Sequence, residues 1–117
     1  MRTICFDLDG VICSQTKGDY ENAIFDQQAI SLINKLYDEG NVILVFTSRF
    51  MGRYKGDIAK AQKEGFEFTS KQLRDNGVKF HTLILGKPRY DVLIDDRAVF
   101  FQKDWTKIEK EIQCSKN

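Results

Sequence analysis

The sequence predicts one α/β domain in which a mostly parallel sheet is covered by helices. Strand-like and helix-like stretches alternate along the chain, which is the pattern of parallel strands joined by crossover helices. The chain has 117 residues, one proline and no stretch typical of an interdomain linker, so we expect residues 1–117 to form a single domain. Hydrophobic residues make up 42% of the sequence, which allows a buried core without disulfides.

The first half of the chain carries the clearest pattern. Residues 3–6 and 41–46 are apolar, β-prone runs and are predicted to be the first two strands. The continuous apolar character of the second run favours a central strand buried on both faces. Between the two runs, residues 27–39 place apolar side chains at helical spacing, with Asp26 as the N-cap and Gly40 as the C-terminal stop.

The remaining segments are less regular. Residues 13–24 are polar and are predicted to be a loop or small flap. In the glycine-containing stretch 50–65, Asp57 is expected to cap a short helix that ends near its last residues, and a second short helix follows up to Gly77. The other predicted elements are strands at residues 79–85, 91–94 and 99–101, and a last helix capped by Asp104.

The composition excludes several classes of protein. Lysine plus arginine number 18 and aspartate plus glutamate 17, so binding of nucleic acid through a basic surface is not expected. No apolar run approaches the roughly 18 residues of a membrane span, and no membrane partner is expected. The three cysteines are scattered and fit neither a disulfide framework nor a zinc site, which predicts a reduced, cytoplasmic protein.

Polar and charged side chains follow each predicted strand, and ligands of open parallel sheets bind at that edge. Taken alone, each of these groups has a structural alternative as a turn, a helix cap or a solvated charge. Taken together, two converging carboxylate pairs repel each other unless a cation or proton lies between them, and oxygen ligands favour Mg²⁺. The residues are Asp7 and Asp9, then Thr47, Ser48 and Arg49, then Lys87, then Asp95 and Asp96.

Four motifs appear in order, as ICFDLDGV, VILVFTSR, ILGKPRYD and VLIDDRA, and they span residues 4–98. As an ordered set they resemble the haloacid dehalogenase superfamily of phosphohydrolases. The resemblance implies a three-layer Rossmann-like core, and the intervals between motifs are too short for a full cap domain, so the site is expected to be open. GDY at 18–20, TSRFM at 47–51, GKP at 86–88 and IDDRAV at 94–99 further resemble bacterial capsule-biosynthesis phosphatases.

This resemblance implies roles for individual residues. Asp7 would be the nucleophile and Asp9 the general acid and base, while Thr47 and Lys87 would stabilise the phosphoryl group. Mg²⁺ would be the cofactor. Its implied ligands are Asp7, the Asp9 backbone carbonyl, Asp95 and Asp96, and the expected substrate-binding residues are Gly10, Ser48, Arg49, Arg53 and Arg97.

The function that these observations favour is a Mg²⁺-dependent phosphomonoesterase that works through an aspartyl-phosphate intermediate. Its substrate would be a small phosphorylated metabolite, with a sugar phosphate or related precursor of capsule or surface polysaccharide as the leading class. One alternative is a nucleotide or polynucleotide-end phosphatase, although the near-neutral charge argues against the polymer. A more remote alternative is a non-catalytic binding domain, against which the complete motif set argues. The open site also suits a homo-oligomer in which a neighbouring subunit encloses the substrate.

Overall fold

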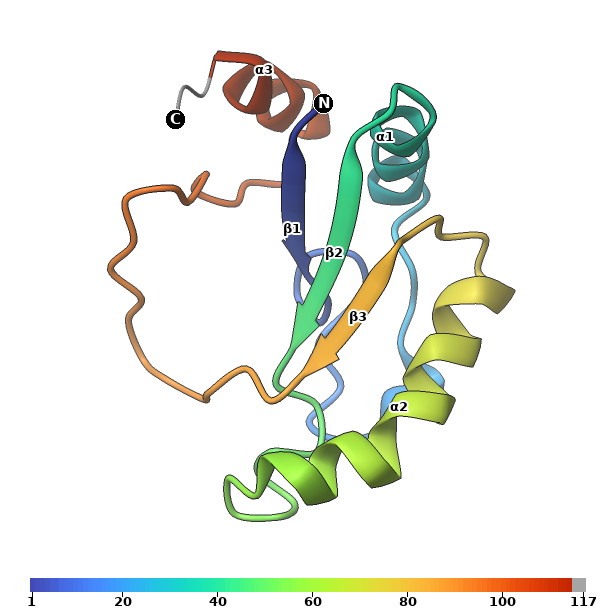
Figure 1. Cartoon of the computed structure of the whole chain (residues 1–117), viewed down its shortest axis with the longest axis vertical. Helices are drawn as coiled ribbons and strands as arrows, with labels where there is room; N and C mark the ends of the chain where they lie inside the picture. The colour runs from blue at the N-terminus through green and yellow to red at the C-terminus, as the bar shows by residue number, and fades with distance from the viewer. Residues whose placement is uncertain (115–117) are drawn as a thin grey trace.

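A computed structural model describes residues 1–114, so residues 115–117 of the predicted domain lie outside the described part (Figure 1). The three strands form one parallel sheet in the order β1-β2-β3, which confirms the predicted α/β class with a parallel sheet. The elements in chain order are β1 (Thr3–Asp7), the 3₁₀ helix η1 (Tyr20–Asn22), α1 (Gln27–Asp38), β2 (Val42–Thr47), α2 (Ile58–Asp75), β3 (Thr82–Leu85) and α3 (Trp105–Cys114).

Helix α1 begins where its capping residue was predicted. The Asp26 carboxylate accepts hydrogen bonds from the backbone N–H groups of Gln28 at 2.9 Å and Ala29 at 3.4 Å, which satisfies donors that the first turn leaves unpaired. Its other oxygen accepts from Trp105 Nε1 at 3.0 Å. One carboxylate therefore starts α1 and fastens the beginning of α3 to it.

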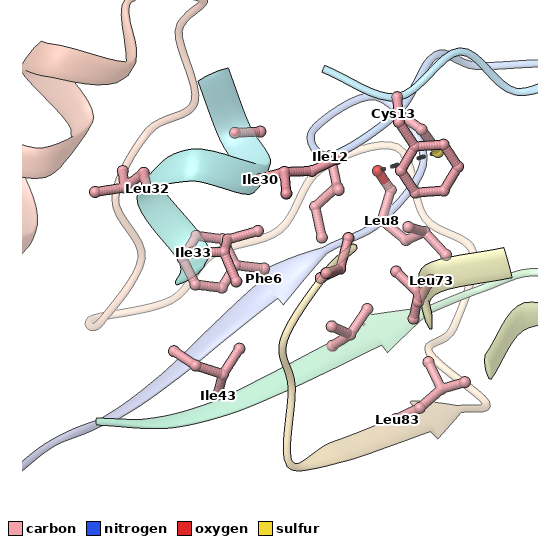
Figure 2. Packing of buried hydrophobic residues seen from close by; sticks show 14 of the residues in the cluster. Phe6, Leu8, Ile12, Cys13, Ile30, Leu32, Ile33, Ile43, Leu73 and Leu83 are labelled. Carbon is pink, nitrogen blue, oxygen red and sulfur yellow. Dashed lines mark hydrogen bonds between the residues drawn. The ribbon is translucent and has the colours of Figure 1, made fainter. Parts of the chain in front are cut away.

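The core lies on one face of the sheet. Phe6, Val45 and Leu83 are aligned across the three strands, and all three are buried. Figure 2 shows that Phe6 and Leu83 lie in the same cluster as Ile33 of α1 and Leu73 of α2. Alternate residues of each strand thus contact helices, as expected when successive side chains point to opposite faces.

The opposite face of the sheet is incompletely covered. Cys5, Leu44 and Thr82 are aligned on that face, and Cys5 and Thr82 are exposed while Leu44 is half-buried. The prediction that the second strand is buried on both faces is therefore wrong. The buried residues of the helices belong to the same cluster as the first face, so they do not cover the second.

Helix α2 is a single helix of 18 residues, and the predicted division into two short helices is wrong. Its start is as predicted, because the Asp57 side chain accepts a hydrogen bond from the Lys60 N–H at 3.1 Å. Gly65 lies inside the helix instead of ending it, and a Cβ added there would overlap Phe50 and Leu85. The glycine allows close packing of α2 on the sheet.

No helix within residues 1–114 combines the length and apolar character that a bilayer-spanning segment needs.

The predicted fourth and fifth strands, at 91–94 and 99–101, are not formed, and β3 begins at Thr82 rather than at residue 79. Residues 86–104 instead form a long loop that extends away from the sheet (Figure 1). Val92 and Ile94 are 75% and 95% exposed. An apolar run predicts a strand but not its partner.

Candidate active site

Three strands deliver Asp7, Thr47 and Lys87 to the carboxyl edge of the sheet, as the sequence predicted. Asp7 is the last residue of β1, and the ammonium of Lys87 lies 3.3 Å from Asp7 Oδ2. The Lys87 N–H donates to the carbonyl oxygen of Thr47 at 3.1 Å, which ties the start of the loop to the end of β2. The result is a carboxylate that faces a fixed cation.

Lys87 carries its positive charge through the physiological pH range. Burial alone would lower the pKa of its ammonium, but a hydrogen bond to Tyr90 and the charge of Asp7 outweigh burial and raise the pKa above 10.5. The stabilisation that the Lys87 ammonium gains from Tyr90 and Asp7 is therefore lost as the pH rises from 10.5 through the raised pKa.

Two residues expected to contact the phosphoryl group are engaged with the protein itself. Thr47 is only 1% exposed, and its hydroxyl oxygen accepts a hydrogen bond from the Arg49 N–H at 3.1 Å. The Gly10 N–H donates to the Cys13 carbonyl at 2.7 Å within a tight turn. Ser48, in contrast, lines the cavity together with Asp7.

Arg49 was expected to contact substrate, but its guanidinium is directed at protein partners. The side chain has no exposed surface, and Nε and Nη2 donate to both oxygens of Asp9 at distances of 2.9–3.2 Å. Nη1 donates to Gln72 Oε1 at 2.6 Å, and the guanidinium lies 4.6 Å from the Tyr20 ring centroid. A planar fork on a carboxylate fixes both the position and the rotation of the Asp9 side chain.

The contacts around this ion pair include residues that sequence reasoning missed. Gln72 of α2 donates from Nε2 to the Tyr20 carbonyl at 2.6 Å, so it links the flap, Arg49 and the helix. The Cys13 thiol lies 3.4 Å from Asp9 Oδ1. Burial, and then the charge of Asp9, raise the pKa of that thiol to about 12. A glutamine on a helix and an isolated cysteine carry no pattern that could have revealed these roles.

A cavity of about 620 Å³ opens at this edge of the sheet. Asp7, Asp9 and Ser48 line it, together with Tyr20 and with cationic side chains from three separate segments. The size falls within the range of sites for small-molecule ligands. Of the two further arginines expected to bind substrate, Arg53 lines this cavity, whereas Arg97 does not and lies on the exposed loop.

The predicted Mg²⁺ ligands are not brought together. Asp95 and Asp96 are exposed on the loop 86–104, and Asp95 accepts a hydrogen bond from the Arg97 N–H at 2.7 Å. The Asp7 carboxylate already accepts a hydrogen bond from the Leu8 N–H at 2.9 Å and pairs with Lys87. Across residues 1–114 no three acidic, histidine or cysteine side chains converge, so the donor set in this arrangement does not fit an octahedral Mg²⁺ ion.

The chain matches no protein-family model and no curated protein. It is similar to the crystal structure of a structural-genomics target from Vibrio cholerae, with a TM-score of 0.78 and 27% sequence identity. The similarity covers 85% of this chain and 83% of that one. Together with the sheet order, it defines the chain as a small Rossmann-like parallel α/β domain.

Proposed function

We propose that this chain is a phosphomonoesterase of the haloacid dehalogenase type that uses Asp7 as its nucleophile. The observation that carries the proposal is the Asp7–Lys87 pair at the carboxyl edge of a parallel sheet, with Asp7 lining a cavity large enough for a metabolite. A carboxylate beside a fixed ammonium suits attack on phosphorus, because the cation offsets the repulsion between the nucleophile and an anionic phosphate.

The reaction that we assign has two displacements at phosphorus. In the first, an Asp7 oxygen forms a bond to phosphorus while the bond to the leaving oxygen breaks, and Asp9 gives that oxygen a proton. In the second, water attacks the aspartyl-phosphate, Asp9 takes the proton, and the Asp7 carboxylate and inorganic phosphate are released. Arg49 keeps the Asp9 carboxyl in place, and Lys87 neutralises charge on the phosphoryl oxygens.

The test is hydrolysis of p-nitrophenyl phosphate by the wild type and by Asp7→Asn, an almost isosteric change that removes the nucleophile. We expect the wild type to turn over and the variant to lose at least about a hundredfold in rate. Asp38→Asn is the matched control, because Asp38 is exposed and pairs only with Lys79 on the surface. A phosphorylated Asp7 peptide in acid-quenched wild-type enzyme would identify the intermediate, whereas an active Asp7→Asn variant would eliminate this nucleophile.

We extend the proposal to the substrate class and the cofactor on the sequence pattern. The substrate would be a sugar phosphate or a related precursor of capsule or surface polysaccharide, and the scattered cysteines favour action in the cytoplasm. Mg²⁺ would be the cofactor only in an arrangement that brings Asp95 and Asp96 to Asp7 and Asp9, which differs from the arrangement described above. The steps assigned above to Asp7, Asp9 and Lys87 do not involve Asp95 or Asp96.

A further inference from the structure

Three cationic side chains besides the buried Arg49 line the cavity, and we call them the cationic rim: Lys17, Arg53 and Arg89. They come from the flap, from the turn after β2 and from the loop after β3, so only the folded chain brings them together. All three are exposed.

The cationic rim has no acidic partner in the part of the chain that the structure describes. None of the ion pairs within residues 1–114 includes Lys17, Arg53 or Arg89. The two acids of the cavity are already paired, Asp7 with Lys87 and Asp9 with a buried arginine. Positive charge therefore exceeds negative charge around the cavity, which attracts an anionic ligand.

Both arginines of the rim are held against other groups. The Arg53 guanidinium lies 4.7 Å from the Phe50 ring centroid and 6.0 Å from that of Tyr20, which are cation–π distances. The Arg89 guanidinium packs on the backbone of Gly52, where an added Cβ would overlap Nη1. Groups that are already positioned lose less conformational entropy when they bind a ligand.

We propose that the cationic rim binds a second anionic group of the substrate. The substrate class is then a phosphomonoester whose leaving group carries a carboxylate or another phosphate. This inference rests on the proposed function, in which Asp7 and Lys87 engage the phosphoryl group that is transferred. A guanidinium offers paired donors that match the oxygens of either anion.

Three ligands that differ only at one carbon test the inference: glucose 1-phosphate, glucuronic acid 1-phosphate and glucose 1,6-bisphosphate. Their dissociation constants are measured by calorimetry on Asp7→Asn, which binds without turnover. We expect at least one of the two ligands with an anionic group at that carbon to bind about tenfold more tightly than glucose 1-phosphate. Whichever of these two ligands has the lower dissociation constant identifies the second anion as carboxylate or phosphate.

Two variants in the Asp7→Asn background link the preference to the rim. Arg89→Ala removes the guanidinium, and Gly52→Ala displaces it while the charge is kept, because the new methyl occupies its place. Both should reduce the preference to within about threefold, because a charged hydrogen bond to the second anion is lost or weakened. Arg74→Ala is the control for net charge, since Arg74 is exposed on α2 away from the cavity, and it should leave the preference unchanged.

Equal affinity for all three ligands, within about twofold, would overturn the inference, as would a preference that survives both rim variants. Failure of the proposed function has a different signature, because the wild type would then hydrolyse none of these esters, nor p-nitrophenyl phosphate. The binding measurement does not depend on turnover, so it decides the role of the rim in either case.

Discussion

Replacing Arg49 by methionine removes the cation that holds Asp9 and should destabilise the protein strongly. The arginine side chain is fully buried, and its fork donates to both oxygens of a carboxylate that is only 15% exposed. Methionine has a similar length and fills much of the space, so the main loss is the pairing. An acid is then left largely buried without its cation.

The expected loss follows from the burial of the pair. Breaking a buried ion pair by removing one partner costs about 3–5 kcal/mol, and the slight exposure of Asp9 favours the lower end. A chain of 117 residues has a free energy of unfolding of roughly 6–18 kcal/mol, so the change removes a sizeable fraction. Arg49→Lys should lose less, about 1–3 kcal/mol, because it keeps the charge but not the fork or the bond to Gln72.

Urea denaturation followed by tryptophan fluorescence of Trp105 measures these changes. With an m-value of about 2 kcal/mol/M, the midpoint of Arg49→Met should fall by about 1.5–2.5 M. Combining it with Asp9→Asn should recover part of the loss, because no carboxylate is then left unpaired. A loss under about 1 kcal/mol for Arg49→Met, or strict additivity in the double variant, would refute the argument from the buried pair.

Two further predictions concern the cysteines and the metal. The raised pKa of Cys13, about 12, keeps its thiol protonated, so iodoacetamide at pH 8 should modify the exposed Cys114 well before Cys13 in the native protein. Mass spectrometry of the labelled peptides checks this, and early labelling of Cys13 would contradict the burial described here. If Mg²⁺ is the cofactor, EDTA should abolish phosphatase activity, and added Mg²⁺ should protect the exposed stretch 92–94 from protease by drawing Asp95 and Asp96 toward Asp7. Full activity in metal-free buffer, with unchanged cleavage on addition of Mg²⁺, would remove the metal from the proposal.

Features that depend on neighbouring residues were predictable. The start of α1 at Asp26 and that of α2 at Asp57 follow from a side-chain oxygen that reaches an amide two or three residues away. The placement of Asp7, Thr47 and Lys87 at one edge was also predictable, because parallel strands end together and each residue follows an apolar run.

The errors arose where contacts between distant segments decide the outcome. Glycine usually weakens a helix, but Gly65 is required in α2 because Phe50 and Leu85 approach it too closely for a side chain. An arginine after a strand usually points to solvent, but Arg49 is buried because Asp9, 40 positions away, pairs with it.

The sequence by itself determined the α/β class, the starts of the first two helices and the group of polar residues at the sheet edge, because periodicity and capping are local. Only the tertiary structure decided that Arg49 positions Asp9, that Arg89 packs on Gly52 to complete the cationic rim, and that residues 91–94 do not pair with β1. Each of these outcomes depends on burial, close packing or pairing between segments that are far apart in the chain, and no local pattern encodes which segments meet.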